Sequence, residues 1–165
     1  RTATVSATTA DPVSGNNSAL VQFTVADLDL DTIPDFNDPD VDGDSIPNDW
    51  ELAFFGGSTN APASADGDMD GFTNLQEYIA MTDPADPDDF FEIRQAAAQG
   101  GGFVLQVPSD PARRYRLRAT PGLVSPVWTD LQTNVPGGAG VLQLTDPAPG
   151  PDFRVYQVDV RLPTP

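Results

Sequence analysis

The stretch that decides how this chain folds is Asp66-Gly67-Asp68-Met69-Asp70-Gly71-Phe72-Thr73-Asn74-Leu75-Gln76-Glu77, here called loop 3. Acidic side chains occupy its positions 1, 3, 5 and 12, with glycine at position 6 and asparagine at position 9. When such a loop curls, positions 1, 3 and 5 converge, glycine allows the sharp turn, and a glutamate at position 12 can close a shell of oxygen ligands around a divalent cation. The spacing predicts a calcium site formed by Asp66, Asp68, Asp70, the Phe72 carbonyl, Asn74 and Glu77.

Two loops upstream repeat this spacing with small departures. Loop 1 spans residues 27–38, and its predicted ligands are Asp27, Asp29, Asp31, the Ile33 carbonyl, Asp35 and Asp38. Loop 2 spans residues 40–51, and its predicted ligands are Asp40, Asp42, Asp44, the Ile46 carbonyl, Asn48 and Glu51. Thr32 and Ser45 stand at position 6 in place of glycine, which weakens the expectation of a sharp turn there. Another register for the middle stretch starts at Asp38 with Gly43 at position 6, but it puts Ile46 at a ligand position, so we prefer the Asp40 register.

The charge distribution supports a role for cations. Between Asp27 and Glu92 the chain has nineteen carboxylates and no Lys, Arg or His, within a total net charge of −17. Unscreened, this density would extend the segment. Oxygen ligands select a hard cation, and a cage built from protein groups favours Ca²⁺ over Mg²⁺, which tends to keep its waters. We expect about three Ca²⁺ ions, and the negative field argues against nucleic acid as a partner.

The acidic segment also carries a family resemblance. Residues 27–49 resemble the thrombospondin type 3 repeat, in which overlapping Asp-rich loops bind a row of Ca²⁺ ions. The runs 40–52, 65–80 and 82–87 are similar to EF-hand-like calcium-binding segments near the ends of many bacterial secreted and surface proteins. The resemblance covers about 65 residues and implies a calcium-stiffened connector in an extracellular or cell-surface location. Millimolar extracellular calcium suits sites of modest affinity.

Composition and periodicity predict a mainly β protein in three parts. Residues 1–26 form an N-terminal β-hairpin or donated strands, 27–89 the calcium-binding segment with two short helices, and 90–165 a small antiparallel β-sandwich. The helices are predicted after Pro47 and after Thr73, whose spacing to Gln76 is a capping box. The sandwich strands are predicted at 91–93, 103–107, 115–119, 127–131, 141–144 and 153–158. Arg114, Arg116 and Arg118 share one strand face, either solvated or meeting the acidic segment of the same or a neighbouring subunit.

The N-terminal part indicates self-assembly. Apolar residues alternate over 3–7 and 19–25 around a turn at 11–18, which resembles the last two strands of an immunoglobulin-like bacterial surface repeat. A lone hairpin is marginal in water, so we expect it to add to a sheet of its own chain, of a second copy, or of an adjacent surface domain. Addition to a second copy would give a head-to-tail filament. The chain begins at Arg1, which indicates a processed chain or a piece of a longer one.

Catalysis is not expected. The chain has no His, Lys or Cys for acid–base or nucleophilic work, and its carboxylates are accounted for as ligands. No apolar run is long enough to span a membrane.

The favoured interpretation is a structural connector or filament subunit. The alternative is a recognition module, either dockerin-like, since loops 2 and 3 pair with helices, or carbohydrate-binding through the sandwich, where Trp128 is the only tryptophan.

Overall fold

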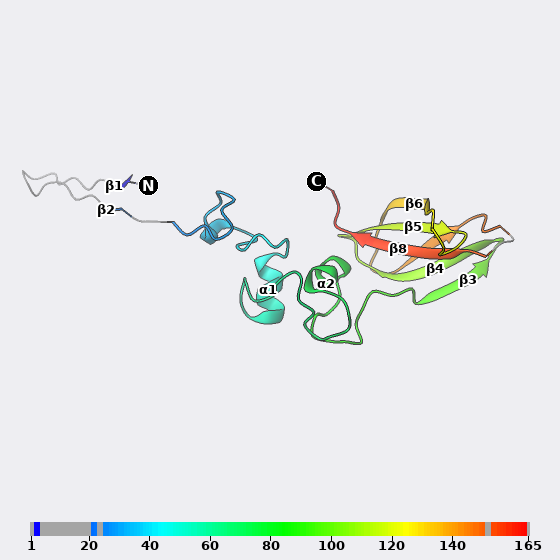
Figure 1. The fold of residues 1–165 in the computed structure, drawn as a ribbon, viewed down its shortest axis with the longest axis horizontal. Coiled ribbons are helices and arrows are strands. Elements are labelled where there is room, and N and C mark those ends of the chain that lie inside the picture. Colours follow the sequence, from blue (N-terminus) through cyan, green and yellow to red (C-terminus); the bar gives the residue numbers. More distant parts are fainter. Residues whose placement is uncertain (1, 4–20, 23–24, 151–152, 165) are drawn as a thin grey trace, which may run out of the picture.

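The computed structural model describes residues 2–3, 21–22, 25–150 and 153–164 (Figure 1). In chain order the elements are β1 (Thr2–Ala3), β2 (Val21–Gln22), a 3₁₀ turn (Asp35–Asn37), α1 (Asn48–Phe55), α2 (Asn74–Ala80), β3 (Gln95–Gln99), β4 (Gly102–Ser109), β5 (Arg114–Thr120), β6 (Thr129–Pro136), β7 (Gly140–Asp146) and β8 (Val155–Arg161). The predicted fold class is confirmed: within the described residues the chain is mainly β, with two short α-helices.

The C-terminal region is a sandwich of two three-stranded sheets. One sheet has the order β3-β4-β7 and the other β6-β5-β8, and every pairing is antiparallel. Their shared core contains Leu105, Val107 and Leu144 from the first sheet and Tyr115 and Leu117 from the second, each at most 1% exposed. Because the two sheets supply one core, each strand needs only one apolar face, which explains the alternation in the sequence.

The position of the first sandwich strand was predicted wrongly. Residues 91–93 lie outside any strand, and β3 instead begins at Gln95. All five residues of β3 are exposed, so no apolar alternation marks it in the sequence. Its register is set by the turn, because Gly100 and Gly101 both have positive φ, +60° and +87°, as a tight two-residue hairpin requires. Strands β6 and β8 are displaced similarly, each starting two residues later than predicted.

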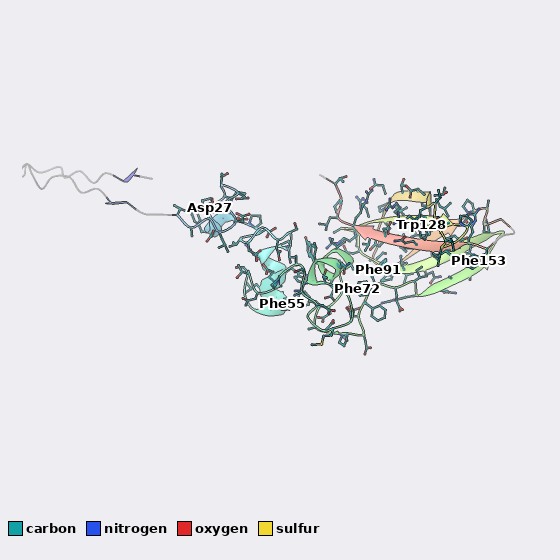
Figure 2. All side chains as sticks on the ribbon, in the orientation of Figure 1. Asp27, Phe55, Phe72, Phe91, Trp128 and Phe153 are labelled. Carbon is teal, nitrogen blue, oxygen red and sulfur yellow. The ribbon has the colours of Figure 1, made fainter. Side chains whose placement is uncertain are left out.

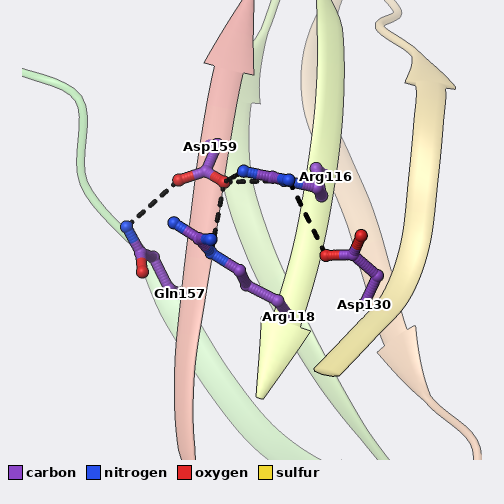
Figure 3. Close-up of polar contacts among 5 residues, drawn as sticks. All are labelled: Arg116, Arg118, Asp130, Gln157 and Asp159. Carbon is purple, nitrogen blue, oxygen red and sulfur yellow. Dashed lines mark hydrogen bonds and ion pairs between the residues drawn. The ribbon is translucent and has the colours of Figure 1, made fainter. Parts of the chain in front are cut away.

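Two of the three arginines on the β5 face are paired with carboxylates within the sandwich. Figure 3 shows Arg116 donating to Asp159 on β8 at 2.6 and 2.8 Å and lying 3.8 Å from Asp130 on β6. Arg118 lies 3.4 Å from the same Asp159 oxygen, and its guanidinium covers the half-buried Trp128 ring at 5.4 Å from the centroid. The idea that this face meets the acidic segment of the same chain is therefore wrong for these two arginines.

The two helices begin and end where the sequence signals them. Thr73 accepts the Gln76 backbone N–H, and the Gln76 side chain accepts the Thr73 N–H, so the predicted capping box forms at α2. Helix α1 ends at Gly56, which has a φ of +74°. The Trp50 ring on α1 lies 5.9 Å from the Tyr78 ring on α2, which packs the helices together.

The predicted N-terminal hairpin falls mostly outside the described residues. Within them, β1 pairs antiparallel with β2, with Thr2 opposite Gln22 and Ala3 opposite Val21. The rest of the alternation and the turn at 11–18 lie outside the described residues. In Figure 1 the acidic loops and helices lie between β2 and the two sheets. Among the described helices, none has the length and apolar character needed to cross a membrane.

Candidate metal centre

The three acidic loops share one backbone conformation although their sequences differ. Position 4 has positive φ in each loop, at +66°, +69° and +70°, and position 6 has positive φ in each, at +83°, +77° and +99°. The residues at positions 4 and 6 are Leu30 and Thr32 in loop 1, Gly43 and Ser45 in loop 2, and Met69 and Gly71 in loop 3. Threonine and serine therefore adopt the turn at position 6 that the sequence made doubtful. A left-handed backbone at such residues costs free energy and is held only when surrounding interactions determine it.

Hydrogen bonds within the loops repeat as well. In all three, the N–H at position 7 donates to the carboxylate at position 5, at 2.7, 2.9 and 2.7 Å. In loops 2 and 3, the N–H at position 6 donates to the position 1 aspartate at 3.0 Å. These bonds leave the other carboxylate oxygens free to converge. The oxygens of positions 1, 3 and 5 lie within 4.8 Å of one another in every loop.

Glu77 closes loop 3 from α2, where it is the fourth helical residue and 1% exposed. Its Oε1 accepts the Thr82 hydroxyl at 3.5 Å, and its Oε2 has no partner. Burial raises the pKa of Glu77 to about 7, and the charges of Asp68 and Asp70 contribute to the same rise. A carboxyl with a raised folded-state pKa opposes folding increasingly as the pH rises from its unfolded pKa through the folded one. At neutral pH this site therefore favours a counter-ion.

Glu51 has the same place in loop 2, as the fourth residue of α1, and is 0% exposed. Its Oε1 accepts the Ala61 N–H at 3.0 Å, while its Oε2 has no partner. Burial raises the pKa of Glu51, and repulsion from Asp42 and Asp44 adds to the rise, while the hydrogen bond from Ala61 lowers the pKa in part. The position 12 glutamates of loops 2 and 3 thus both face their aspartate triads, as the Asp40 register requires.

Buried oxygens without partners gather in the loops. Of the ten buried side-chain nitrogen or oxygen atoms that lack a hydrogen bond among the described residues, nine are oxygens of loop residues. They belong to Asp27 and Asp38 of loop 1, to Asp40, Asp42 and Glu51 of loop 2, and to Asp68, Asp70, Asn74 and Glu77 of loop 3. Leaving a buried acceptor unpaired costs about 1–3 kcal/mol, and more for a charged one. Five of the nine belong to the aspartate triads, whose geometry could hold a metal ion.

The position 9 residues differ between the loops. Asn74 turns a buried, unpaired Oδ1 toward loop 3 and donates from Nδ2 to the Pro62 carbonyl at 3.1 Å. Asn48 uses both ends of its amide on the backbone, accepting from Val41 at 3.0 Å and donating to the Asp38 carbonyl at 2.6 Å. Asp35 accepts the Leu28 N–H at 2.8 Å. Asn74 therefore has an unpaired side-chain oxygen at position 9, whereas the Asn48 amide joins loop 2 to the end of loop 1.

Loop 1 is the most open of the three. Its positions 9–11 form a 3₁₀ turn rather than the start of an α-helix, and Ile33 at position 7 is 39% exposed, whereas Ile46 of loop 2 is fully buried. Its closing residue, Asp38, is 7% exposed with an unpaired Oδ2. A Cβ placed on Gly43 of loop 2 would lie 2.8 Å from Asp29 Oδ2, so the two loops are in close contact.

Sequence reasoning missed the groups that support the ligands. The Thr82 hydroxyl and the Ala61 N–H each hold one oxygen of a closing glutamate, and both lie outside the twelve-residue templates. The Thr-Asp-Pro run after α2 was visible as part of the family resemblance, without a role for Thr82. Arg113, which reaches α2 from the sandwich, had no local signal at all.

Comparison with known proteins finds no relative: no protein-family model, no curated protein and no solved structure matches this chain. The fold and the loops alone define it as a mainly β protein with three acidic loops of common backbone geometry.

The contact between loops 1 and 2 predicts that Gly43→Ala is more harmful than glycine strain alone. Gly56 is a matched control, because its φ of +74° resembles the +69° of Gly43, while a Cβ added to Gly56 would have no atom within 4 Å. In the presence of calcium, Gly56→Ala should lower the free energy of unfolding by about 1 kcal/mol. Gly43→Ala should lower it by about 2–3 kcal/mol, measured by denaturant titration. Equal losses would show that the loops are not in contact.

Proposed function

We propose that this chain is a non-enzymatic structural protein whose loops bind about three Ca²⁺ ions, acting outside the cell as a calcium-stiffened connector or filament subunit. The observation that carries the proposal is the pair of fully buried glutamates, Glu51 and Glu77, each with an unpaired oxygen beside an aspartate triad. A buried carboxyl next to three others must either keep a proton or be accompanied by a cation, and the aspartate triads favour the cation.

The ligand sets favour calcium. Loop 3 offers three aspartates, the Phe72 carbonyl, Asn74 and both oxygens of Glu77 once the cation displaces the weak Thr82 contact, which suits a site with six to eight oxygen ligands. Loop 2 offers the same set, with a water at position 9 in place of Asn48, a common arrangement in such loops. Mg²⁺ demands six ligands in a tight octahedron and retains waters, which a cage of this size does not suit.

Binding would convert electrostatic repulsion into rigidity. Three divalent ions bring the net charge from −17 to −11, and all of the added charge is placed in the segment that repels itself. Each ion would also join residues up to eleven positions apart, which restricts a segment that has little regular secondary structure. A stiff spacer of this kind requires no catalytic group, and its calcium demand suits an extracellular location.

Calcium removal should unfold the loop segment selectively. At free calcium one hundred times the dissociation constant, each site stabilises the folded state by about 2.7 kcal/mol. We expect excess EGTA to abolish a calorimetric transition assigned to residues 27–89 while the sandwich transition of residues 90–164 persists. Adding Mg²⁺ at the same concentration should not restore the lost transition. Identical melting curves with calcium and with EGTA would refute structural calcium.

Glu77→Gln should weaken loop 3 most strongly, because it removes a bidentate charged ligand. We expect the affinity of one site to fall by about 100-fold or more, equivalent to about 2.8 kcal/mol, in calorimetric titration with calcium. Glu92→Gln makes the same chemical change at an exposed position outside the loops and should leave every site unchanged. If the Glu77 variant bound calcium as tightly as the Glu92 variant, the assignment of loop 3 would be wrong.

The filament part of the proposal rests on strand addition. The described portions of β1 and β2 pair over only two residues each, which is too little to be stable alone. Among the described strands, the outer strands of both sheets pair on one side only, and β3 is exposed along its whole length. A hairpin from one copy that adds to a sheet edge of the next would complete both, and repetition would produce an open head-to-tail chain.

Deleting residues 1–26 should therefore abolish assembly and leave calcium binding intact. Full-length protein with calcium is expected to form fibres by negative-stain microscopy, and the truncated chain is expected to sediment as a monomer with the same calcium stoichiometry. Fibres of unchanged repeat from the truncated chain would exclude the hairpin as the linker. A full-length protein that stays monomeric at high concentration would instead support docking within one chain and the recognition-module alternative.

A further inference from the structure

A buried arginine joins the sandwich to the helix that closes loop 3. Arg113 lies in the turn between β4 and β5 and is 5% exposed. Its Nε donates to the Ile79 carbonyl and its Nη2 to the Tyr78 carbonyl, both at 2.7 Å. The guanidinium carbon also lies 5.2 Å from the centroid of the Tyr78 ring. One side chain of the sandwich therefore makes three contacts with the last turn of α2.

These contacts suit the end of a helix. The last carbonyls of a helix lack intrahelical partners and carry partial negative charge, so a guanidinium there forms charge-assisted hydrogen bonds. The same helix carries Glu77, one residue before Tyr78, and its end is closed by N–H bonds from Met81 and Thr82 to the Glu77 carbonyl. Any change in how α2 is placed therefore moves the closing ligand of loop 3.

An open groove runs along the rest of this junction. It has a volume of about 340 Å³ and lies between α2 and β8, and its lining includes Phe72, Ile79, Phe91 and Val158. Figure 2 shows Phe72 and Phe91 in this region, between the helices and the sheets. Beside this groove, the Arg113 hydrogen bonds are the direct polar contacts that the structure shows between the sandwich and α2 among the described residues.

The junction extends to loop 2 through aromatic contacts. Tyr78 packs edge-on against Trp50 of α1, with ring centroids 5.9 Å apart. Trp50 precedes Glu51, as Tyr78 follows Glu77. Each closing glutamate is therefore adjacent in the chain to one of the two aromatic residues, and the Arg113 guanidinium lies over the Tyr78 ring.

We propose that Arg113 is a positioning residue that couples calcium binding in loop 3 to docking of the sandwich on α2, so that calcium fixes the angle between the two parts of the chain. The inference rests on the proposed calcium-binding function and adds a regulated joint to it. If docking of the sandwich raises the calcium affinity of loop 3 by some factor, then calcium must raise the equilibrium constant for docking by the same factor. Couplings of this kind are commonly about 5–150-fold, and two charge-assisted hydrogen bonds favour a value of about tenfold.

The test compares Arg113→Met with Arg94→Met in the full chain. Arg94 is exposed, so its substitution makes the same change in charge without touching α2. Calcium affinity is measured by calorimetry, and the loop 3 site is identified as the one that Glu77→Gln removes. The chain has no cysteine, so spin labels can be attached at Ala53→Cys on α1 and Thr133→Cys on β6 alone. Pulsed electron paramagnetic resonance then reports the distance between the helices and the sandwich.

With native Arg113, calcium should narrow the distance distribution. Arg113→Met should keep the circular dichroism of the sandwich, lower loop 3 affinity about tenfold, and leave the distribution broad in calcium. Arg113→Lys keeps the charge but loses the paired hydrogen-bond geometry, so its loop 3 affinity and distance distribution should lie between those of the native chain and the Met variant. This variant provides the test if the Met variant misfolds. Unchanged calcium affinity and a narrow distance distribution in these variants would refute the role of Arg113 and leave the proposed calcium binding untouched. Absence of calcium binding by the unmodified chain would overturn the proposed function as well.

Discussion

The rest of this structure depends on the repulsion among closely spaced carboxylates that have no basic neighbours in the chain. Every basic side chain lies outside residues 27–92, and Arg116 and Arg113 are engaged within the sandwich and at the end of α2 respectively. The acidic segment therefore contains no side chain able to neutralise it. Its loops nevertheless converge their oxygens and bury two glutamates. Protons on the buried glutamates or cations from solution would relieve this repulsion, and the proposed calcium ions are such cations.

The two helices transmit this constraint to the remainder of the chain. Each begins within a loop and supplies a glutamate as its fourth residue, so the helix cannot move without moving a proposed ligand. Their aromatic residues pack against each other, and α2 is held in turn by Arg113. Rigidity generated at a metal site would therefore reach the sandwich through a short series of direct contacts. Loop 1, which lacks a helix, is connected through Asp38, Asn48 and the close approach of Asp29 to Gly43.

The sequence predicted those features that local chemistry determines. The spacing of the aspartates located the three clusters of converging carboxylates, and the capping residues Thr73 and Gln76 located α2. Alternation found the central strands, but it missed β3, because Gln-Ala-Ala-Ala-Gln has no buried face and its place is fixed by the glycine turn and by pairing with β4. Arg113 was also missed, because its partners lie more than thirty residues away in the chain. Contacts of that kind depend on the tertiary arrangement and leave no pattern in the sequence.

The central claim is that each loop holds one calcium ion, and native mass spectrometry tests it most directly by counting bound ions. Intact protein sprayed from a volatile buffer with a small excess of calcium should show a dominant species carrying three Ca²⁺, and the same excess of magnesium should not produce it. A spectrum dominated by ion-free protein, or a broad ladder of adducts that is the same for calcium and magnesium, would contradict the account. Non-specific ion pairing with surface carboxylates gives no preferred count and no preference for calcium over magnesium.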